Sequence, residues 1–286
     1  MSLKIIVDST SDVSAEQIKN HQLTVVPLTT HFGDEEFLDG VTMTPQEFFK
    51  RLESDPNHPT TSQPSPEVFM KAFREAIDNG DEVLAITISG KLSGTYQSAR
   101  LAAMELDSDR IYIVDSENVS LGIQVLLEYA CRLRAEGKSG AEIAAVLEEK
   151  KHEVRVLAVV DTLKYLHRGG RISKTVAVAG NLLSIKPILE ITDGEILMVG
   201  KARGAKSSER LLNKLIEERG NIDFDQPFCL AYSGLDPAPL DEYVDSYTDL
   251  WESHVAREAI PVAVIGSTIG THAGPGAIGV AFFGNK

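Results

Sequence analysis

Short apolar segments alternate with amphipathic segments along the first half of the chain. The strand-like apolar runs are residues 4–7, 23–30, 83–86 and 110–116. Between them, apolar residues recur at helical spacing, and capping boxes that begin at Ser14, Thr44 and Ser139 mark three helix starts. This alternation of strand and helix predicts a parallel sheet covered by helices. The acidic segment 31–40 and the proline-rich segment 59–66 are expected to be loops.

The second half of the chain has a different pattern. The turn signal Asp193-Gly194 separates two strand-like runs, 186–192 and 195–199, and predicts a two-residue hairpin. Further strands are expected at residues 155–160, 228–232, 260–265 and 277–283. The sequence therefore predicts an α/β protein of two domains. Residues 1–153 are expected to form the parallel-sheet domain with its flanking helices, and residues 154–286 a mixed α/β sheet domain.

The composition is typical of a soluble globular protein. The chain has 286 residues, of which 43% are hydrophobic and 24% charged, and its formal net charge is −14. This acidic balance opposes binding to nucleic acid and to anionic lipid surfaces, which both favour a basic face. The apolar runs are too short for a membrane span, and the first residues do not resemble a signal peptide. We therefore expect a cytoplasmic protein without stable membrane insertion.

Cysteine and histidine usage indicates neither a disulfide framework nor a metal centre. Cys131 and Cys229 are far apart in apolar surroundings, so both are expected to be buried thiols. The sequence has no cluster with metal-ligand spacing and no pair of acidic residues at a recognisable catalytic spacing. No metal and no cofactor are expected.

The first candidate site follows the apolar run 83–86. A glycine-containing turn leads from this run into a segment with helical spacing, a strand–loop–helix arrangement. The amides of the first helical turn at Gly94 would attract an anion, and the hydroxyls of Ser93 and Thr95 could bind it as well. In the alternative interpretation, Ser93 or Thr95 only caps the helix. A phosphate-binding loop is excluded because Lys91 precedes Gly94, and the spacing of a nucleophile elbow is absent.

Two further segments present polar side chains next to prolines or glycines. In the segment 59–66, the hydroxyls of Thr61 and Ser62 face a ligand or cap the helix that follows. His272 lies among glycines in the segment 266–276, which is expected to connect two strands, so the backbone there can approach a ligand closely. The alternative is a surface or core histidine. Hydroxyls, amides and one imidazole suit a carboxylate or a phosphate.

The order of these motifs resembles the DegV family over essentially the whole chain. The matching segments are residues 8–12, 61–65, 92–99, 115–116, 163–166, 170–172 and 272–276. The resemblance implies two α/β domains with a long-chain fatty acid between them. By motif position, Ser93 matches the carboxylate-binding serine, Thr61 the threonine of the Thr-Ser-Gln-Pro loop and His272 the histidine of the terminal glycine-rich loop. Gly90 departs from the small polar residue of many members but leaves the Leu-Ser-Gly-Thr motif untouched.

The resemblance also implies a role and a partner. Characterised members are the fatty-acid-binding subunit of a bacterial two-component fatty acid kinase. A separate ATP-dependent kinase subunit phosphorylates the carboxylate, and the acyl phosphate enters phospholipid synthesis. This chain is then a lipid-binding subunit without catalytic activity of its own. The residues expected at the carboxylate are Thr61, Ser62, Ser93, Gly94, Thr95 and His272.

A group of basic residues is conspicuous in this acidic chain. It consists of Arg171, Lys201, Arg203 and Lys206. These residues form either an ordinary solvated face or a docking patch for the kinase or the transferred phosphate.

Two other functions remain open. One is a serine-dependent lipid esterase or acyltransferase that uses Ser93 with His272, although the sequence offers no identifiable acid as a third member. The other is a phosphate or phospho-sugar binding module that uses the same helix terminus.

Overall fold

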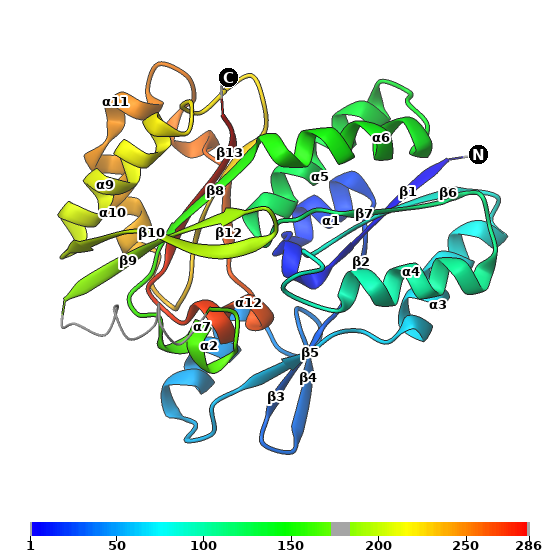
Figure 1. Cartoon of the computed structure of the whole chain (residues 1–286), viewed down its shortest axis with the longest axis horizontal. Coiled ribbons are helices and arrows are strands. Elements are labelled where there is room, and N and C mark those ends of the chain that lie inside the picture. The colour runs from blue at the N-terminus through cyan, green and yellow to red at the C-terminus, as the bar shows by residue number, and fades with distance from the viewer. Residues whose placement is uncertain (1, 173–183, 285–286) are drawn as a thin grey trace.

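The computed structural model describes residues 2–172 and 184–284, and Figure 1 shows two sheet-containing halves joined side by side. The first sheet has the order β2-β1-β6-β7 and is parallel throughout. Its strands are β1 (Leu3–Asp8), β2 (Thr24–Val26), β6 (Glu82–Thr87) and β7 (Ile111–Asp115). The predicted parallel sheet is confirmed. The run 23–30 is divided, because Pro27 lies between β2 and the next strand.

Helices cover both faces of the parallel sheet, as the alternation of strands and helices predicts. They are α1 (Ala15–His21), α3 (Pro66–Asp78), α4 (Thr95–Leu106), α5 (Leu121–Ala135) and α6 (Gly140–Lys150). Alternate residues of β6 point to opposite faces. Val83 and Ala85 pack with Phe69 and Phe73 of α3. Leu84 and Ile86 point to the other face and pack with residues of α5 and α6. The continuous apolar runs are therefore strands buried on both faces.

The second sheet is mixed and has the order β10-β9-β8-β13-β11-β12. Its strands are β8 (Val154–Val159), β9 (Ile185–Thr192), β10 (Glu195–Arg203), β11 (Phe228–Tyr232), β12 (Val262–Val264) and β13 (Ile278–Phe283). Only the pair β11–β12 is parallel among these described strands. Asp193 and Gly194 both have positive φ and connect β9 to β10, which confirms the predicted hairpin.

Further helices and turns lie in the second half or at its start. They are α7 (Lys164–Arg168), α9 (Ala205–Glu218), α10 (Ala238–Ser246), α11 (Thr248–Trp251) and α12 (Ser267–Ala273), with short 3₁₀ turns at Lys151–Glu153 and Arg257–Ala259. Helices α9, α10 and α11 cover the outer face of the mixed sheet, where Trp251 and Tyr243 are buried. No helix within residues 2–172 and 184–284 is long and apolar enough to cross a membrane.

A third, antiparallel sheet forms where the sequence predicted loops. It consists of β3 (Thr29–Phe32), β4 (Glu35–Leu38) and β5 (Thr60–Ser62), in the order β4-β3-β5. The expectation of loops at 31–40 and 59–66 is therefore wrong at these strands. Arg51 of α2 (Pro45–Ser54) binds Glu35 at 2.8 Å and lies over the rings of Phe32 and Phe37. This distant arginine offsets the acidic charge that made the segment resemble a loop.

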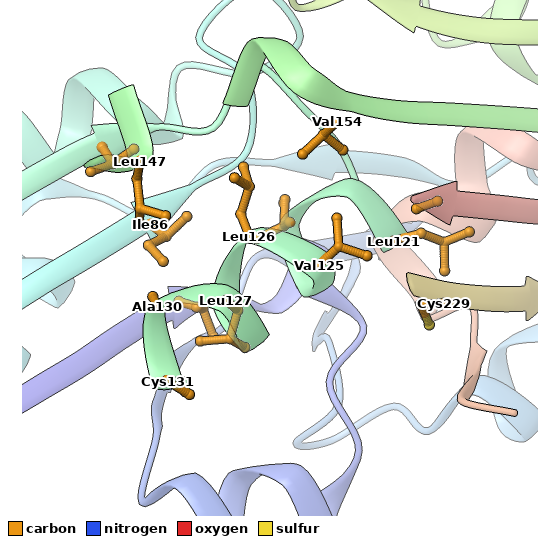
Figure 2. Packing of buried hydrophobic residues seen from close by; sticks show 14 of the residues in the cluster. Ile86, Leu121, Val125, Leu126, Leu127, Ala130, Cys131, Leu147, Val154 and Cys229 are labelled. Atoms are coloured by element: carbon orange, nitrogen blue, oxygen red, sulfur yellow. The ribbon is translucent and has the colours of Figure 1, made fainter. Parts of the chain in front are cut away.

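Helix α5 packs against both large sheets. Figure 2 shows Leu126 and Leu127 of this helix near Ile86 of the parallel sheet, and Leu121 and Val125 toward the mixed sheet, where Val154 and Cys229 lie. These residues belong to one hydrophobic cluster that extends across both halves. Cys131 and Cys229 are buried free thiols, as predicted. Because one helix completes the core of both sheets, we infer that the two halves have limited freedom to move apart.

Candidate functional site

An apolar pocket lies between the two large sheets. Its atom-free space, together with the open solvent at its mouth, is about 970 Å³. Residues from both halves of the chain line it, and most of these side chains are aliphatic. They include Ile88, Leu121, Val156, Leu189, Ile265 and Ile269. Such a wall favours an elongated apolar ligand.

A few polar side chains interrupt the apolar wall. Among the described residues they are Thr61, Ser93, Ser120, Arg171, Thr268 and His272. Three of the predicted site residues, Thr61, Ser93 and His272, are thus brought to one pocket from three separate parts of the chain. A pocket that is apolar along most of its wall and polar at a few points suits an amphipathic ligand.

Thr61 and His272 are in contact at the pocket wall. Oγ1 of Thr61, on β5, lies 2.9 Å from Nε2 of His272, on α12. His272 lies within α12, which spans Ser267–Ala273. The expectation that the segment 266–276 is a connecting loop is wrong for these residues. The glycines on either side, Gly266 and Gly274, delimit this helix instead.

The imidazole of His272 is partly buried and neutral. Its pKa is lowered from 6.5 to about 4, first by burial and then by the nearby charges of Arg171 and His58. Nδ1 is buried without a partner among the described residues. A Cβ at Gly169 would lie 2.0 Å from this nitrogen, so only a glycine there allows the end of α7 to approach the ring. His272 can form hydrogen bonds near pH 7 but supplies no charge.

Ser93 lies directly before α4, in the strand–loop–helix arrangement predicted from the sequence. Its Oγ is 2.8 Å from Oγ1 of Thr95 and accepts a weak hydrogen bond from the amide of Thr95. Gly94 is the N-cap residue, and a Cβ there would lie 1.9 Å from Oε1 of Gln63. Gly94 therefore lets the loop after β5 lie against the start of α4. Thr95 holds the Ser93 hydroxyl in place through these two hydrogen bonds.

Ser62 points away from Thr61, because adjacent residues of a strand face opposite sides. Its Oγ is 2.9 Å from Nε2 of His31 on the exposed face of the small sheet. Within the described part of the chain, Ser62, Gly94 and Thr95 are not in the pocket wall, whereas Thr61 and Ser93 are. Of the six residues expected at the carboxylate, Thr61, Ser93 and His272 thus line the pocket, whereas Ser62, Gly94 and Thr95 do not.

The basic residues also fall into two groups. Arg171 lines the pocket, donates from Nε to the carbonyl of Leu92 at 3.2 Å and contacts the carbonyl of Gly169. Lys201 and Arg203 are exposed on β10. Arg171 therefore holds the loop before Ser93 against the end of α7. Among the described residues that line the pocket, Arg171 is the one that carries a positive charge.

Acidic side chains of the first half hold the start of α12. Oδ1 of Asp39 accepts hydrogen bonds from the amide and the hydroxyl of Ser267, both at 2.8 Å. Oδ1 of Asp12 accepts a hydrogen bond from the amide of Gly266 at 2.8 Å. Helix α12 has no side-chain cap of its own, so these two carboxylates supply the caps from distant segments.

Burial raises the pKa of two acids near this junction. The pKa of Asp8 is raised from 3.8 to about 6, although its carboxylate accepts the amide of Ile88 at 2.7 Å. The pKa of Asp12 is raised well above its usual value, first by burial and then by the charge of Asp39. The residues that the structure describes contain no group of three His, Cys, Asp or Glu side chains suited to hold a metal ion.

Sequence reasoning missed Thr268 and Ser120 as pocket residues. Thr268 precedes His272 by one helical turn, so the two share a face of α12. This signal was available only once the segment was known to be a helix. The hydroxyl of Ser120 donates to the carboxylate of Asp12. Ser120 has a positive φ of 50° directly before α5, a conformation that the sequence alone did not indicate.

The geometry does not assemble a catalytic triad around Ser93. A serine nucleophile needs a histidine that is itself oriented by an acid. Nε2 of His272 is occupied by Thr61, and no carboxylate in the described part of the chain meets Nδ1.

Comparison with known proteins gives a consistent result. The sequence matches the model of a family described as uncharacterised proteins of the DegV family over residues 2–285. A DegV domain-containing protein of Caldanaerobacter subterraneus subsp. tengcongensis is 37% identical over 280 residues, which are 98% of this chain and 98% of that protein.

Solved structures with the same fold support this match. The structure that reports fatty acid binding of a DegV family protein from Thermus thermophilus has a TM-score of 0.86 and 34% identity, and covers 98% of this chain and 99% of its own. The Streptococcus pneumoniae Fatty Acid Kinase (Fak) B3 protein, loaded with linoleic acid, has a TM-score of 0.85 with 99% of each chain covered. Its identity of 21% makes this second likeness evidence of the fold alone.

Proposed function

The chain belongs to the DegV family, and from this premise we propose that it binds a long-chain fatty acid in the pocket between its two large sheets. The observation that carries the proposal is the composition of the pocket wall, which is aliphatic except for the few polar groups around Thr61, Ser93 and His272. The fatty acid binding described for the Thermus thermophilus relative supports it.

The polar groups are suited to a carboxylate. Arg171 would supply a charge-assisted hydrogen bond, and the hydroxyls of Thr61 and Ser93 would donate further ones. His272 is neutral and is hydrogen-bonded to Thr61. It would therefore orient the Thr61 hydroxyl toward the carboxylate rather than supply a positive charge. A carboxylate in this partly desolvated place needs such donors, because an unpaired buried charge is costly.

The apolar wall would supply most of the affinity. Burial of one methylene group is worth about 0.8 kcal/mol. A chain of about sixteen carbons would gain roughly 10 kcal/mol or more before the costs of ordering and association. The tail therefore provides affinity, and the polar end provides orientation.

We further propose that the chain presents the carboxylate to a separate ATP-dependent kinase and has no catalytic activity of its own. The acyl phosphate would then feed phospholipid synthesis. This finer proposal rests on the family motifs and on the exposed basic residues Lys201 and Arg203, which are suited to dock an enzyme that handles phosphate. Because Arg171 lines the pocket, we assign it to the carboxylate and leave docking to the exposed residues.

Organic extraction of the purified protein followed by mass spectrometry tests the proposal. We expect a non-covalently bound saturated or monounsaturated fatty acid. Ser93→Ala should weaken fatty acid retention by about tenfold to a hundredfold, because it removes one hydrogen bond to a charged group, worth roughly 1.5 to 3 kcal/mol. Ser207→Ala, which removes an exposed hydroxyl on α9, is the matched control and should change nothing.

Three results would contradict this function. Empty protein under gentle native mass spectrometry, with no affinity for added fatty acid, would remove the proposed ligand. Covalent labelling of Ser93 by a fluorophosphonate, lost in Ser93→Ala, would favour the esterase alternative. A gain in stability with phosphate or a sugar phosphate, but none with fatty acid, would favour a phosphate-binding module.

A further inference from the structure

The polar groups proposed for the carboxylate lie at one end of the mixed sheet. Arg171 follows α7, which itself follows the end of β8, and His272 lies on α12, shortly before β13 begins. Strands β8 and β13 are antiparallel neighbours, so the end of β8 and the start of β13 lie together. The far end of the pocket therefore lies toward the start of β8.

Alternate residues along β8 form the wall between the two ends of the pocket. In order away from the polar end they are Val160, directly after the strand, then Ala158 and Val156. The wall from Val160 to Val156 is about 13 Å long, because a strand rises about 3.3 Å per residue. In its middle, Ala158 lies opposite Gly279 of β13, which also lines the pocket. These two small residues leave room for an acyl chain that follows β8.

Three β-branched side chains form the last row of this wall. Val156 of β8 lies opposite Ile191 of β9, and Ile191 lies opposite Ile196 of β10. All three line the pocket. In the same row on β13 and β11, Ala281 and Cys229 pack in the core with α5 and do not belong to the described pocket wall. The pocket is therefore deepest along β8, β9 and β10, where this row closes it.

Ile191 also separates the apolar pocket from a second, polar space. Its side chain lines both. The second space is lined by ion pairs from both halves of the chain: Lys151 lies 2.9 Å from Glu117, and Arg219 lies 2.7 Å from Glu190. The methyl end of an acyl chain gains free energy where it is removed from water into apolar surroundings, and these charged groups do not provide them. The apolar path therefore ends at Ile191.

We propose that Ile191 sets the longest acyl chain that the pocket accepts. The tail lies along β8 with its methyl end against Ile191, and Val156 and Ile196 hold this side chain from the neighbouring strands. Methylene groups beyond this point must displace Ile191 or enter the polar space, so their burial adds no affinity. This inference rests on the proposed function, because it takes the fatty acid as given and assigns the residue that selects its length.

Calorimetry with dodecanoate, hexadecanoate and icosanoate on the delipidated full-length protein tests the assignment. Ile191→Ala removes the closing side chain, so affinity for icosanoate relative to hexadecanoate should rise at least tenfold. Ile191→Phe extends it toward the carboxyl end, so affinity for hexadecanoate relative to dodecanoate should fall at least tenfold. Leu197→Ala is the matched control, because it shortens an aliphatic side chain of the same hairpin that is 45% exposed and outside the described pocket wall. It should keep the ranking of the unmodified protein.

Three results would overturn the inference. The first is an unchanged ranking of the three acids in both Ile191 variants. The second is an equal loss of affinity for all three acids in Ile191→Phe, because a residue at the far end does not obstruct the shortest acid. The third is a shift in Leu197→Ala as large as that in Ile191→Ala. If none of the acids binds the unmodified protein, the proposed function itself fails.

Discussion

Asp8 shows how burial and hydrogen bonding oppose each other at a single side chain. Its carboxylate accepts the amides of Thr10 and Ile88, which favours the charged form. Burial disfavours that form more strongly, and the pKa rises from 3.8 to about 6. Asp8 therefore holds the end of β1 against the start of the Ser93 loop, and its charge at neutral pH carries a cost.

This raised pKa predicts a pH dependence of stability. The folded state binds the Asp8 proton more tightly than the unfolded state, so the contribution of this group is complete below pH 3.8 and is lost as pH rises through about 6. Relative to Asp8→Asn, the wild-type protein should lose about 2 kcal/mol of unfolding free energy between pH 4 and pH 7. Urea unfolding of both proteins across this range measures the difference. A constant difference would show that Asp8 titrates normally.

Helix α12 depends for its position on caps from the other half of the molecule. It carries Thr268 and His272, yet Asp12 and Asp39 supply the acceptors for its first amides. Thr30 adds a contact, since its Oγ1 lies 2.9 Å from Oγ of Ser267. The pocket wall is therefore positioned by the segments that join β1 to α1 and β4 to α2.

Removal of one cap should affect binding beyond its effect on stability. Asp39→Ala leaves the amide of Ser267 without its acceptor, which should cost about 1 to 3 kcal/mol of unfolding free energy, while the hydroxyl keeps its contact with Thr30. The displaced helix should also lower fatty acid affinity at least tenfold, measured by calorimetry where the protein is fully folded.

A cap on a helix far from the pocket provides the control. Glu142→Ala breaks the capping box of α6, which does not belong to the described pocket wall. It should lower stability to a similar degree and leave fatty acid affinity unchanged. Equal losses of affinity in Asp39→Ala and Glu142→Ala would mean that binding reports only global stability.

At the scale of the molecule, the acidic surface and the exposed basic residues on β10 bear on the proposed kinase partner. The chain has a formal net charge of −14, yet Lys201 and Arg203 are exposed on the same strand. Side chains two positions apart on a strand share a face, so these two charges act together. A local basic patch on an acidic protein can orient it during encounter with a partner.

Charge reversal at this patch should separate docking from lipid binding. Lys201→Glu with Arg203→Glu should lower acyl phosphate formation with a cognate kinase about tenfold at low salt, with a smaller effect at high salt because exposed charges are screened. Fatty acid binding should be unchanged. Lys71→Glu with Arg74→Glu on α3 carries the same charge change at another exposed place and should leave turnover intact. Undiminished turnover in the first variant would identify the patch as ordinary surface.

Signals between residues close in sequence predicted the parallel sheet, one hairpin of the mixed sheet and the place of Ser93. Continuous apolar runs, capping boxes and the Asp193-Gly194 turn predicted the parallel sheet, its helices and the β9–β10 hairpin, because these signals act between residues close in sequence. The glycine-containing turn before α4 located Ser93 in the same way.

The rest of the pocket depends on contacts between segments that are distant in sequence. The segment 267–273 is helical because Asp12 and Asp39, distant in sequence, cap it, and no local signal encodes such a partner. The third sheet likewise depends on a pairing distant in sequence, that of β3 with β5, in which Thr30 lies opposite Thr61. Arg171 lines the pocket because α7 and the loop before Ser93 meet there. A residue's environment depends on which distant segments pack around it. Contacts between distant segments, and not local periodicity, therefore determine which of these residues line the pocket.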